Sequence, residues 1–505
     1  MSTKKTPKPR PLSTPSRGWI GRGRGTATMV QAPPQWRGTS VQVCGLWPFA
    51  VGSGTPMVGV PLGRHIRTGA TLCCDPISWF QRAHLISNPS AFILGLPGLG
   101  KSTVARRMSL GLAGYGVSSL YLGDLKGEHV PLIRALGGQV IRLGRGRGSI
   151  NVLDPGEARA AATRLTGSAR AEVLADAHTR RRTMVSALIT IMRGVPPTDR
   201  EETIVDRALH VLDDAAVPGQ VPVLGDLLTV IRQAPEPVRE VALDRGSLDR
   251  YREVTENLEA SLLAVSSGGR FGDMFSRPTS EPMRRDRSIV VDISGLDEGD
   301  TDLKAATLLA CWSAGFATVN VAQALAQAGL EPMRHYLLVL DELWQALRAG
   351  RGMVDRVDSL TRLNRSWGVG QILLSHTMRD LMSLPDEADR MKARGFVERS
   401  GMVICGGLPH DEMRRLNDAS VRLSHSEETM LESWQDPPSW DAQLGREAEP
   451  PGRGRFLVKV GGKPGIPIRV ELTSAERTLN DTNVLWHQQS RVGADAQPAH
   501  REGVA

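Results

Sequence analysis

The chain has 505 residues, which is more than one hydrophobic core accommodates, so its length predicts two folded units with tails. Its five cysteines include no C-x-x-C pair and have no histidines at metal-ligand spacing, which argues against a zinc site and against a disulfide framework. This cysteine use fits a reducing cytosol. The formal net charge of +8 belongs to the first 40 residues, which hold eight lysines and arginines and no acidic residue.

Residues 1–40 are predicted to form a disordered basic arm, rich in proline, glycine and serine. The arm is either a solvated tail or a binder of DNA or anionic lipid. Its prolines interrupt any apolar core of a secretory signal. Residues 41–87 predict a small β-rich segment, with strands at 58–63 and 70–74 in a cap that leads into the next strand.

Residues 91–102 predict a short apolar strand, a glycine-rich turn and the start of a helix that runs from 103 to about 112. The spacing Gly95-x4-Gly100-Lys101-Ser102 is that of a phosphate-binding loop. Backbone N–H groups would surround the β-phosphate, Lys101 would reach the β- and γ-oxygens, and Ser102 would ligate Mg²⁺. A chance glycine turn would lack this strand and helix. The predicted nucleotide-binding residues are Gly95, Leu96, Pro97, Gly98, Leu99, Gly100, Lys101, Ser102 and Thr103.

After this helix, a strand over 118–122 that leads to Asp124, a helix to Ala135 and a strand over 139–143 predict a parallel sheet in residues 88–156. Residues 157–285 carry long helical patterns and predict an all-α insertion domain. Within the insertion, Thr198 and Glu201 have the spacing of a capping box that opens a helix over 202–215. A second helix is expected from Ser247 through Leu263.

Residues 286–484 predict the second part of the core, beginning with a strand over 288–293 and a helix over 302–328. The buried strand expected at 335–340 ends in Asp341 and Glu342, in the form of a Walker B element. Asp341 would hold Mg²⁺, and Glu342 would orient or deprotonate the attacking water. The structural alternative is that both acids cap a helix over 343–347.

The next expected elements are a helix over 354–367 and a strand that ends in Ser375 and His376. Both side chains are predicted sensors of the γ-phosphate, with a helix cap as the alternative for Ser375. Further strands are expected at 401–405, 455–460 and 466–472, followed by a helix capped by Thr473 and Glu476. Residues 485–505 predict a disordered tail.

The order of these motifs resembles the conjugative-transfer (TraC-like) ATPases of type IV secretion systems, in the FtsK/HerA superfamily of P-loop motors. The resemblance covers about residues 59–476. The sequence departs from the family pattern at His376, where glutamine is usual, and in its amino-terminal segment, which is shorter than in the family. Besides the two Walker elements, the matching segments are Asn88-Pro89, Asp124–Glu128, Gly137–Leu143, Ile150–Pro155, Phe271–Phe275 and Arg365–His376.

This resemblance implies an α/β fold with a RecA-like P-loop NTPase core, a mostly parallel sheet and an all-α insertion. It implies a cytoplasmic Mg²⁺-dependent ATPase that forms a homo-hexamer and energises a conjugative or type IV secretion machine for DNA or protein transfer. Channel components would be its partners, with DNA and the inner face of the membrane as further candidates. Arg362 or Arg365 would be supplied to a neighbouring subunit's site. With Arg365 in that role, the expected catalytic residues are Glu342, Lys101, His376 and Arg365. The alternative is a hexameric motor that translocates DNA directly.

Overall fold

The computed structural model describes residues 55–479, except 216, 218, 267–270, 272, 298, 349–353, 355–357, 359–367, 385, 420, 442–445 and 448. All of these residues belong to one compact unit. The predicted basic arm, the disordered tail, most of the helix expected at 354–367, and both Arg362 and Arg365 lie outside the described residues.

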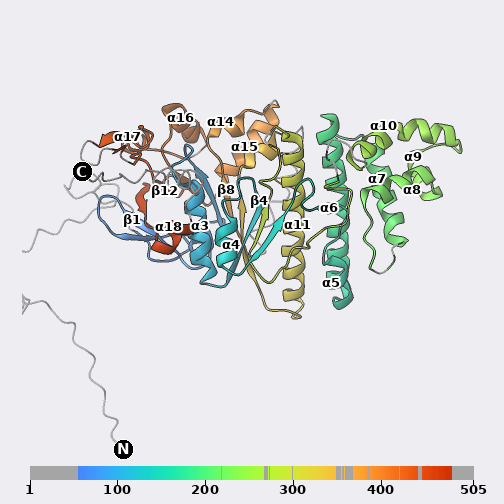
Figure 1. Cartoon of the computed structure of the whole chain (residues 1–505), viewed down its shortest axis with the longest axis horizontal. Coiled ribbons are helices and arrows are strands. Elements are labelled where there is room, and N and C mark those ends of the chain that lie inside the picture. The colour runs from blue at the N-terminus through green and yellow to red at the C-terminus, as the bar shows by residue number, and fades with distance from the viewer. Residues whose placement is uncertain are drawn as a thin grey trace, which may run out of the picture. The chain divides into compact units, whose positions relative to one another are not determined.

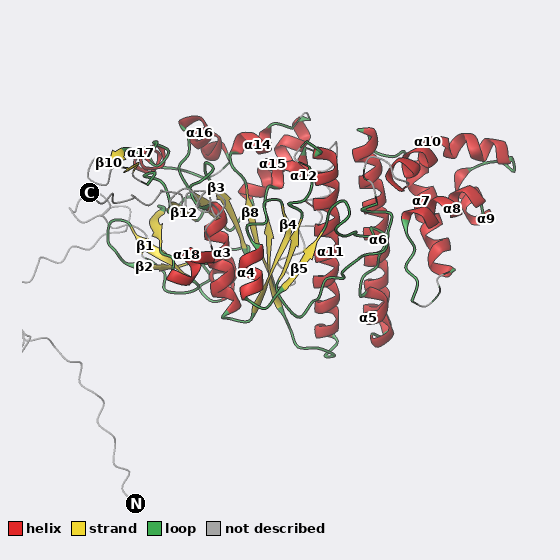
Figure 2. Ribbon diagram, in the orientation of Figure 1, coloured by secondary structure: helices red, strands yellow, loops and turns green. Residues whose placement is uncertain are grey.

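A mixed sheet of 11 strands forms the centre of the described structure, in the order β2-β1-β13-β12-β9-β3-β8-β7-β4-β6-β5 (Figures 1 and 2). The seven strands from β9 to β5 are parallel to one another, and the other four are antiparallel to their neighbours. The strands are β1 Pro61–His65, β2 Thr71–Cys73, β3 Ser90–Leu94, β4 Val117–Asp124, β5 Gln139–Arg142, β6 Ile289–Asp292, β7 His335–Leu340, β8 Val369–Leu374, β9 Met402–Cys405, β12 Arg455–Lys459 and β13 Ile466–Val470; a separate pair is β10 Trp440–Asp441 and β11 Arg446–Glu447.

The helices are α2 Pro76–Gln81, α3 Lys101–Ala113, α4 Val130–Ala135, α5 Ala158–Arg164, α6 Gly167–Arg193, α7 Asp199–Asp214, α8 Leu224–Gln233, α9 Glu236–Ala242, α10 Leu248–Ser266, α11 Thr301–Gln327, α12 Leu343–Leu347, α14 Met378–Met382, α15 Glu387–Glu398, α16 His410–Asp418, α17 His425–Ser433 and α18 Ser474–Leu479. Helices α5 to α10 follow β5, and the chain returns to the sheet at β6. The capping boxes predicted at Thr198 and Thr473 are both present.

Two hydrophobic cores lie on opposite faces of the sheet, because alternate side chains of a strand point in opposite directions. In β3, Phe92 and Leu94 belong to one core, whereas Ala91 and Ile93 belong to the other. Helices α2, α3 and α4 cover the second core, while α11, α12, α14 and the insertion contribute to the first. The result is a three-layer α/β/α arrangement in which both faces of the parallel strands are buried.

Helix α11 is long and apolar enough to cross a membrane by composition, with a mean hydropathy of 1.4 over its best window. In the structure, 78% of that window is buried inside the protein. Its side chains instead fill the core beside β4, where the Trp312 indole donates to the backbone oxygen of Leu122 at 2.7 Å. We therefore read α11 as a core helix between the sheet and α6.

The amino-terminal β segment does not form a separate cap. Strand β1 pairs with β13 from the far end of the chain, so β1 and β2 extend the antiparallel edge of the main sheet. The described part of the predicted β-rich cap therefore contributes two strands to the main sheet. Pairing between segments some 400 residues apart leaves no trace in local sequence patterns.

Candidate nucleotide-binding site

The segment between β3 and α3 forms the predicted glycine-rich loop. Gly98 (φ +79°) and Gly100 (φ +100°) adopt left-handed conformations that a side chain would disfavour. Helix α3 begins at Lys101, and no side chain of the described structure caps its first turn. Its amino-terminal N–H groups and its positive dipole end therefore suit an anion.

Lys101 is buried at the base of this loop, with 9% of its surface exposed. Its Nζ donates to the backbone oxygens of Gly95 at 2.6 Å and Leu96 at 3.2 Å, and lies 2.9 Å from Nδ1 of His376. Burial lowers the pKa of Lys101 to about 8, against the opposing effect of the Glu342 and Asp341 carboxylates. The ammonium is therefore mostly charged at neutral pH, as a phosphate contact requires.

The predicted acid pair follows β7 directly. Glu342 has a φ of +51°, a conformation rare for a residue with a side chain, which costs about 1–3 kcal/mol. Its carboxylate accepts a hydrogen bond from the Trp344 indole at 2.6 Å, while Lys126 Nζ lies 3.5 Å from Oε1. Such strain persists only where surrounding contacts hold it, and it is most frequent at functional sites.

Burial by itself would raise the pKa of Glu342. The hydrogen bonds from His376 and from the Trp344 indole, together with the Lys126 ammonium, outweigh burial and lower the pKa to about 2. Glu342 is therefore ionised at neutral pH, although only 8% of its surface is exposed. An ionised, buried carboxylate can orient a water molecule or accept its proton.

His376 connects the two Walker elements. Its Nδ1 faces Lys101 at 2.9 Å and its Nε2 lies 3.2 Å from Glu342 Oε1. A neutral ring with its proton on Nε2 satisfies both contacts, since it accepts from the lysine and donates to the carboxylate. Strand order explains this position: β8, which His376 follows closely, lies between β3 and β7.

His129 is a site residue that the sequence analysis missed. It is almost fully buried, stacks on Tyr121 with ring centroids 4.1 Å apart, and lies 3.4 Å through Nε2 from Asp341 Oδ2. The loop that carries it is fixed by Asp124, whose carboxylate accepts from the His129 backbone N–H at 2.7 Å. The sequence shows only a histidine five residues after the strand-ending Asp124, and its burial becomes visible with the fold.

The structure brings Lys101, Glu342 and His376 together and leaves Ser375 aside. The Ser375 hydroxyl donates to the backbone oxygen of Thr377 at 3.4 Å, and Thr377 is the residue that caps α14. The expected helix cap therefore stands two residues later than Ser375.

Ser102, at the start of α3, and Asp341 offer the oxygen ligands that Mg²⁺ prefers, so the residues present fit this cation.

No family model matches this sequence, and no curated protein matches it. Among solved structures, VirB4 of Thermoanaerobacter pseudethanolicus aligns with a TM-score of 0.60 and 19% identity, over 84% of this chain and 100% of that one. The bacterial conjugative coupling protein TrwB aligns with a TM-score of 0.48 and 12% identity, over 82% of this chain and 90% of that one. The likeness to VirB4 establishes a shared fold and confirms the expected RecA-like P-loop architecture.

Proposed function

We propose that this chain is a Mg²⁺-dependent ATPase that energises a conjugative or type IV secretion machine for DNA or protein transfer. One observation carries the hydrolase assignment: His376 contacts both Lys101 and Glu342. The lysine that would bind phosphate and the carboxylate that would activate water therefore lie in one site. The shared fold with VirB4 supports the secretion context.

Each group has a distinct part in the proposed reaction. The loop backbone and the first turn of α3 hold the phosphates, and Lys101 contacts the transferred group. Ser102 and Asp341 would hold Mg²⁺, which supplies positive charge to the phosphate oxygens. Glu342 orients the attacking water and takes its proton, while the role of His376 as the sensor of the γ-phosphate stays a prediction. Arg365 stays a prediction as the residue that a neighbouring subunit supplies.

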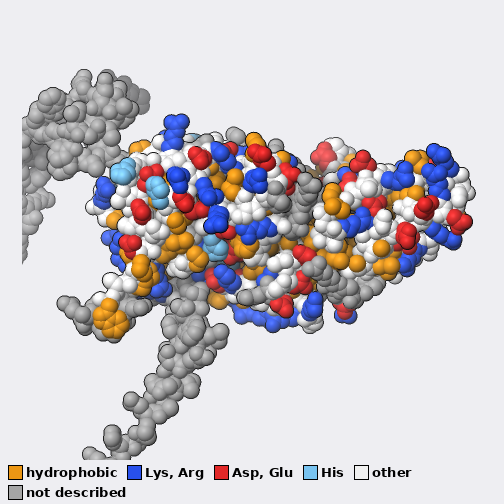
Figure 3. Space-filling model, turned by 90° about the horizontal axis from the view of Figure 1, so that it is seen from above, with side chains coloured by type: hydrophobic (Ala, Val, Ile, Leu, Met, Phe, Trp, Pro, Cys, Tyr) orange, Lys and Arg blue, Asp and Glu red, His pale blue; other side chains and the backbone are white. Residues whose placement is uncertain are grey.

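The charge distribution favours an energiser over a motor that grips DNA. The basic arm accounts for the net charge, so the remainder of the chain is about neutral. On the face seen in Figure 3, Lys and Arg side chains are interspersed with Asp and Glu. Non-specific binding to duplex DNA requires several cationic contacts to phosphates. We therefore favour an energiser of the secretion channel, with direct DNA translocation as the second candidate. We infer that the protein acts in the cytoplasm.

The proposal is tested by phosphate release from ATP by the purified chain with and without Mg²⁺. Lys101→Ala removes the buried cation and should lower turnover by at least about 100-fold and weaken ATP binding. Lys463→Ala, which removes an exposed lysine, serves as the matched control and should behave as the wild type. Mg²⁺-independent release, or full activity of Lys101→Ala, would refute the assignment.

We infer that the chain forms a homo-hexamer in which each ATP site is completed by the next subunit. Inactive subunits should therefore reduce the activity of their wild-type neighbours. Excess Lys101→Ala protein mixed with the wild type should lower the activity per wild-type subunit. The measurement is turnover across a series of mixing ratios, with Lys463→Ala as the added protein in the control. Activity strictly proportional to the wild-type fraction counts against shared sites.

A further inference from the structure

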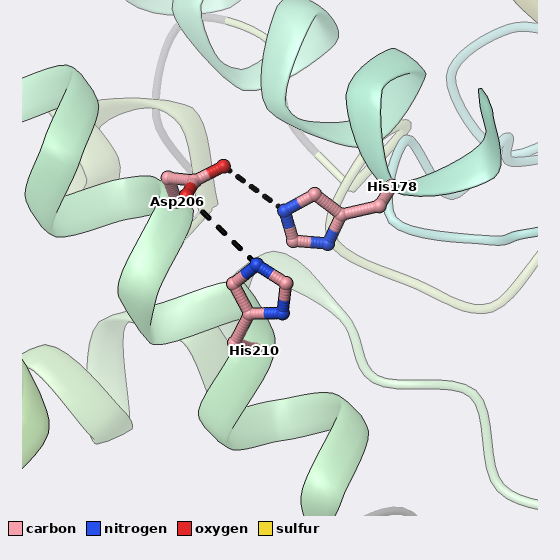
Figure 4. Close-up of side chains that lie close together, drawn as sticks. All are labelled: His178, Asp206 and His210. Carbon is pink, nitrogen blue, oxygen red and sulfur yellow. Dashed lines mark hydrogen bonds and ion pairs between the residues drawn. The ribbon is translucent and has the colours of Figure 1, made fainter. Parts of the chain in front are cut away.

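A cluster of metal-ligating side chains lies in the helical insertion. Asp206 and His210 stand four residues apart on α7 and therefore share one face of that helix. His178 reaches the same place from α6 (Figure 4). One potential ligand atom of each residue lies within 4.8 Å of the other two. Two imidazoles and a carboxylate from two helices form a common three-residue set for zinc.

The spacing of the ligand atoms suits a tetrahedral cation. His178 Nε2 lies 3.0 Å from Asp206 Oδ1, and His210 Nε2 lies 3.9 Å from Asp206 Oδ2. Zinc bonds of about 2.0–2.2 Å at tetrahedral angles place ligand atoms about 3.4 Å apart. The observed separations lie on either side of this value and run to different oxygens of Asp206, so the three side chains are near one another but must still be reoriented around a cation.

The surroundings of His178 provide a second, independent observation. Its other nitrogen, Nδ1, is buried without a hydrogen-bond partner among the described residues and lies 3.6 Å from Asp213 Oδ2. Asp213 is itself held by Arg181, at 2.8 and 2.5 Å, and by Arg159 at 2.7 Å. A metal-bound histidine characteristically turns its second nitrogen toward a carboxylate that is fixed in this way.

A cation can reach the cluster from solvent. A cavity of about 660 Å³ is lined by His178, His210 and Asp213 and has room for a water molecule as the fourth ligand. The Arg182 guanidinium lies 3.4 Å from the Asp206 carboxylate. Because 44% of the Arg182 side chain is exposed, it can move into solvent when a metal ion binds.

Binding requires one rearrangement. The two imidazole rings are stacked, with centroids 4.0 Å apart and an angle of 21° between their planes. Since a metal lies in the plane of each ring that ligates it, both rings cannot ligate in this arrangement. The side chain of His210 is 53% exposed and can turn, whereas that of His178 is 15% exposed and is held in place.

We propose that His178, Asp206 and His210 bind one transition-metal cation, Zn²⁺ by the character of its ligands, and that this cation ties α6 to α7. Nitrogen ligands favour Zn²⁺ over Mg²⁺ and Ca²⁺, which prefer oxygen. The site lies in the insertion and its ligands are separate from those proposed for ATP hydrolysis.

The test uses the untagged, metal-stripped full chain in excess Mg²⁺, which occupies sites made of oxygen ligands. Co²⁺ serves as the probe because tetrahedral coordination gives it a strong visible absorption, and Zn²⁺ should displace it. The wild type should bind one equivalent. His210→Ala should bind at least about tenfold more weakly, while His425→Ala, an exposed histidine of α17, should match the wild type.

Two further variants make the result decisive. Asp206→Asn keeps the shape of the side chain and should weaken Co²⁺ binding even if His210→Ala were to fold poorly. Asp341→Asn should leave it unchanged, which separates the cluster from the nucleotide site. Wild-type binding in both His210→Ala and Asp206→Asn, loss of binding in Asp341→Asn, or no Co²⁺ bound by the wild type would overturn the proposal.

Discussion

Glu342→Gln is expected to bind Mg²⁺ and ATP with nearly wild-type affinity and to hydrolyse ATP at least about 100-fold more slowly. The amide can keep the hydrogen bond from Trp344, so the strained backbone at this position retains that support. It lacks the negative charge, however, and a proton acceptor for water is lost. Binding of a labelled ATP analogue and single-turnover hydrolysis measure the two effects separately.

The control for this variant is Glu387→Gln, which makes the same change at an exposed position in the first turn of α15. It should hydrolyse ATP at the wild-type rate. If Glu342→Gln also does so, Glu342 is not the base, and its low pKa and its backbone strain need another explanation. If Glu342→Gln loses ATP binding instead, the carboxylate acts in assembling the site.

The sequence predicted the elements that have strong local signals. The glycine spacing, the buried strand before Asp341 and the capping boxes at Thr198 and Thr473 depend on neighbours within a few residues, and the structure contains each of them. Helices α14 to α17 were missed although α14 and α17 open with capping boxes of the same kind, Thr377 with Asp380 and Ser424 with Glu427, so a local signal was present for these two.

Strand order was the part that local patterns could not supply. The contact of His376 with both Lys101 and Glu342 exists because β8 lies between β3 and β7, and these strands are far apart in the sequence. The same limit explains His129, whose contact with Asp341 joins residues 212 positions apart. Side-chain contacts of this kind follow from the fold and become visible only with it.

His376→Ala is expected to lower turnover by about 10–100-fold with little change in ATP affinity. Two contacts disappear together: Lys101 loses an acceptor, and Glu342 loses the hydrogen bond that contributes most to lowering its pKa. The pKa of Glu342 should rise as a result. A base of raised pKa works only at higher pH, so the acid side of the pH–rate profile should shift upward in this variant.

His376→Gln separates a chemical role from a structural one. Glutamine supplies an oxygen that can accept from Lys101 and an amide N–H that can donate to Glu342, so it should restore much of the turnover. His376→Ala supplies neither group, so the difference in turnover between the two variants measures what the two hydrogen bonds contribute. Equal turnover of His376→Gln and His376→Ala, or full turnover of His376→Ala, would return His376 to the role of a polar residue after a strand.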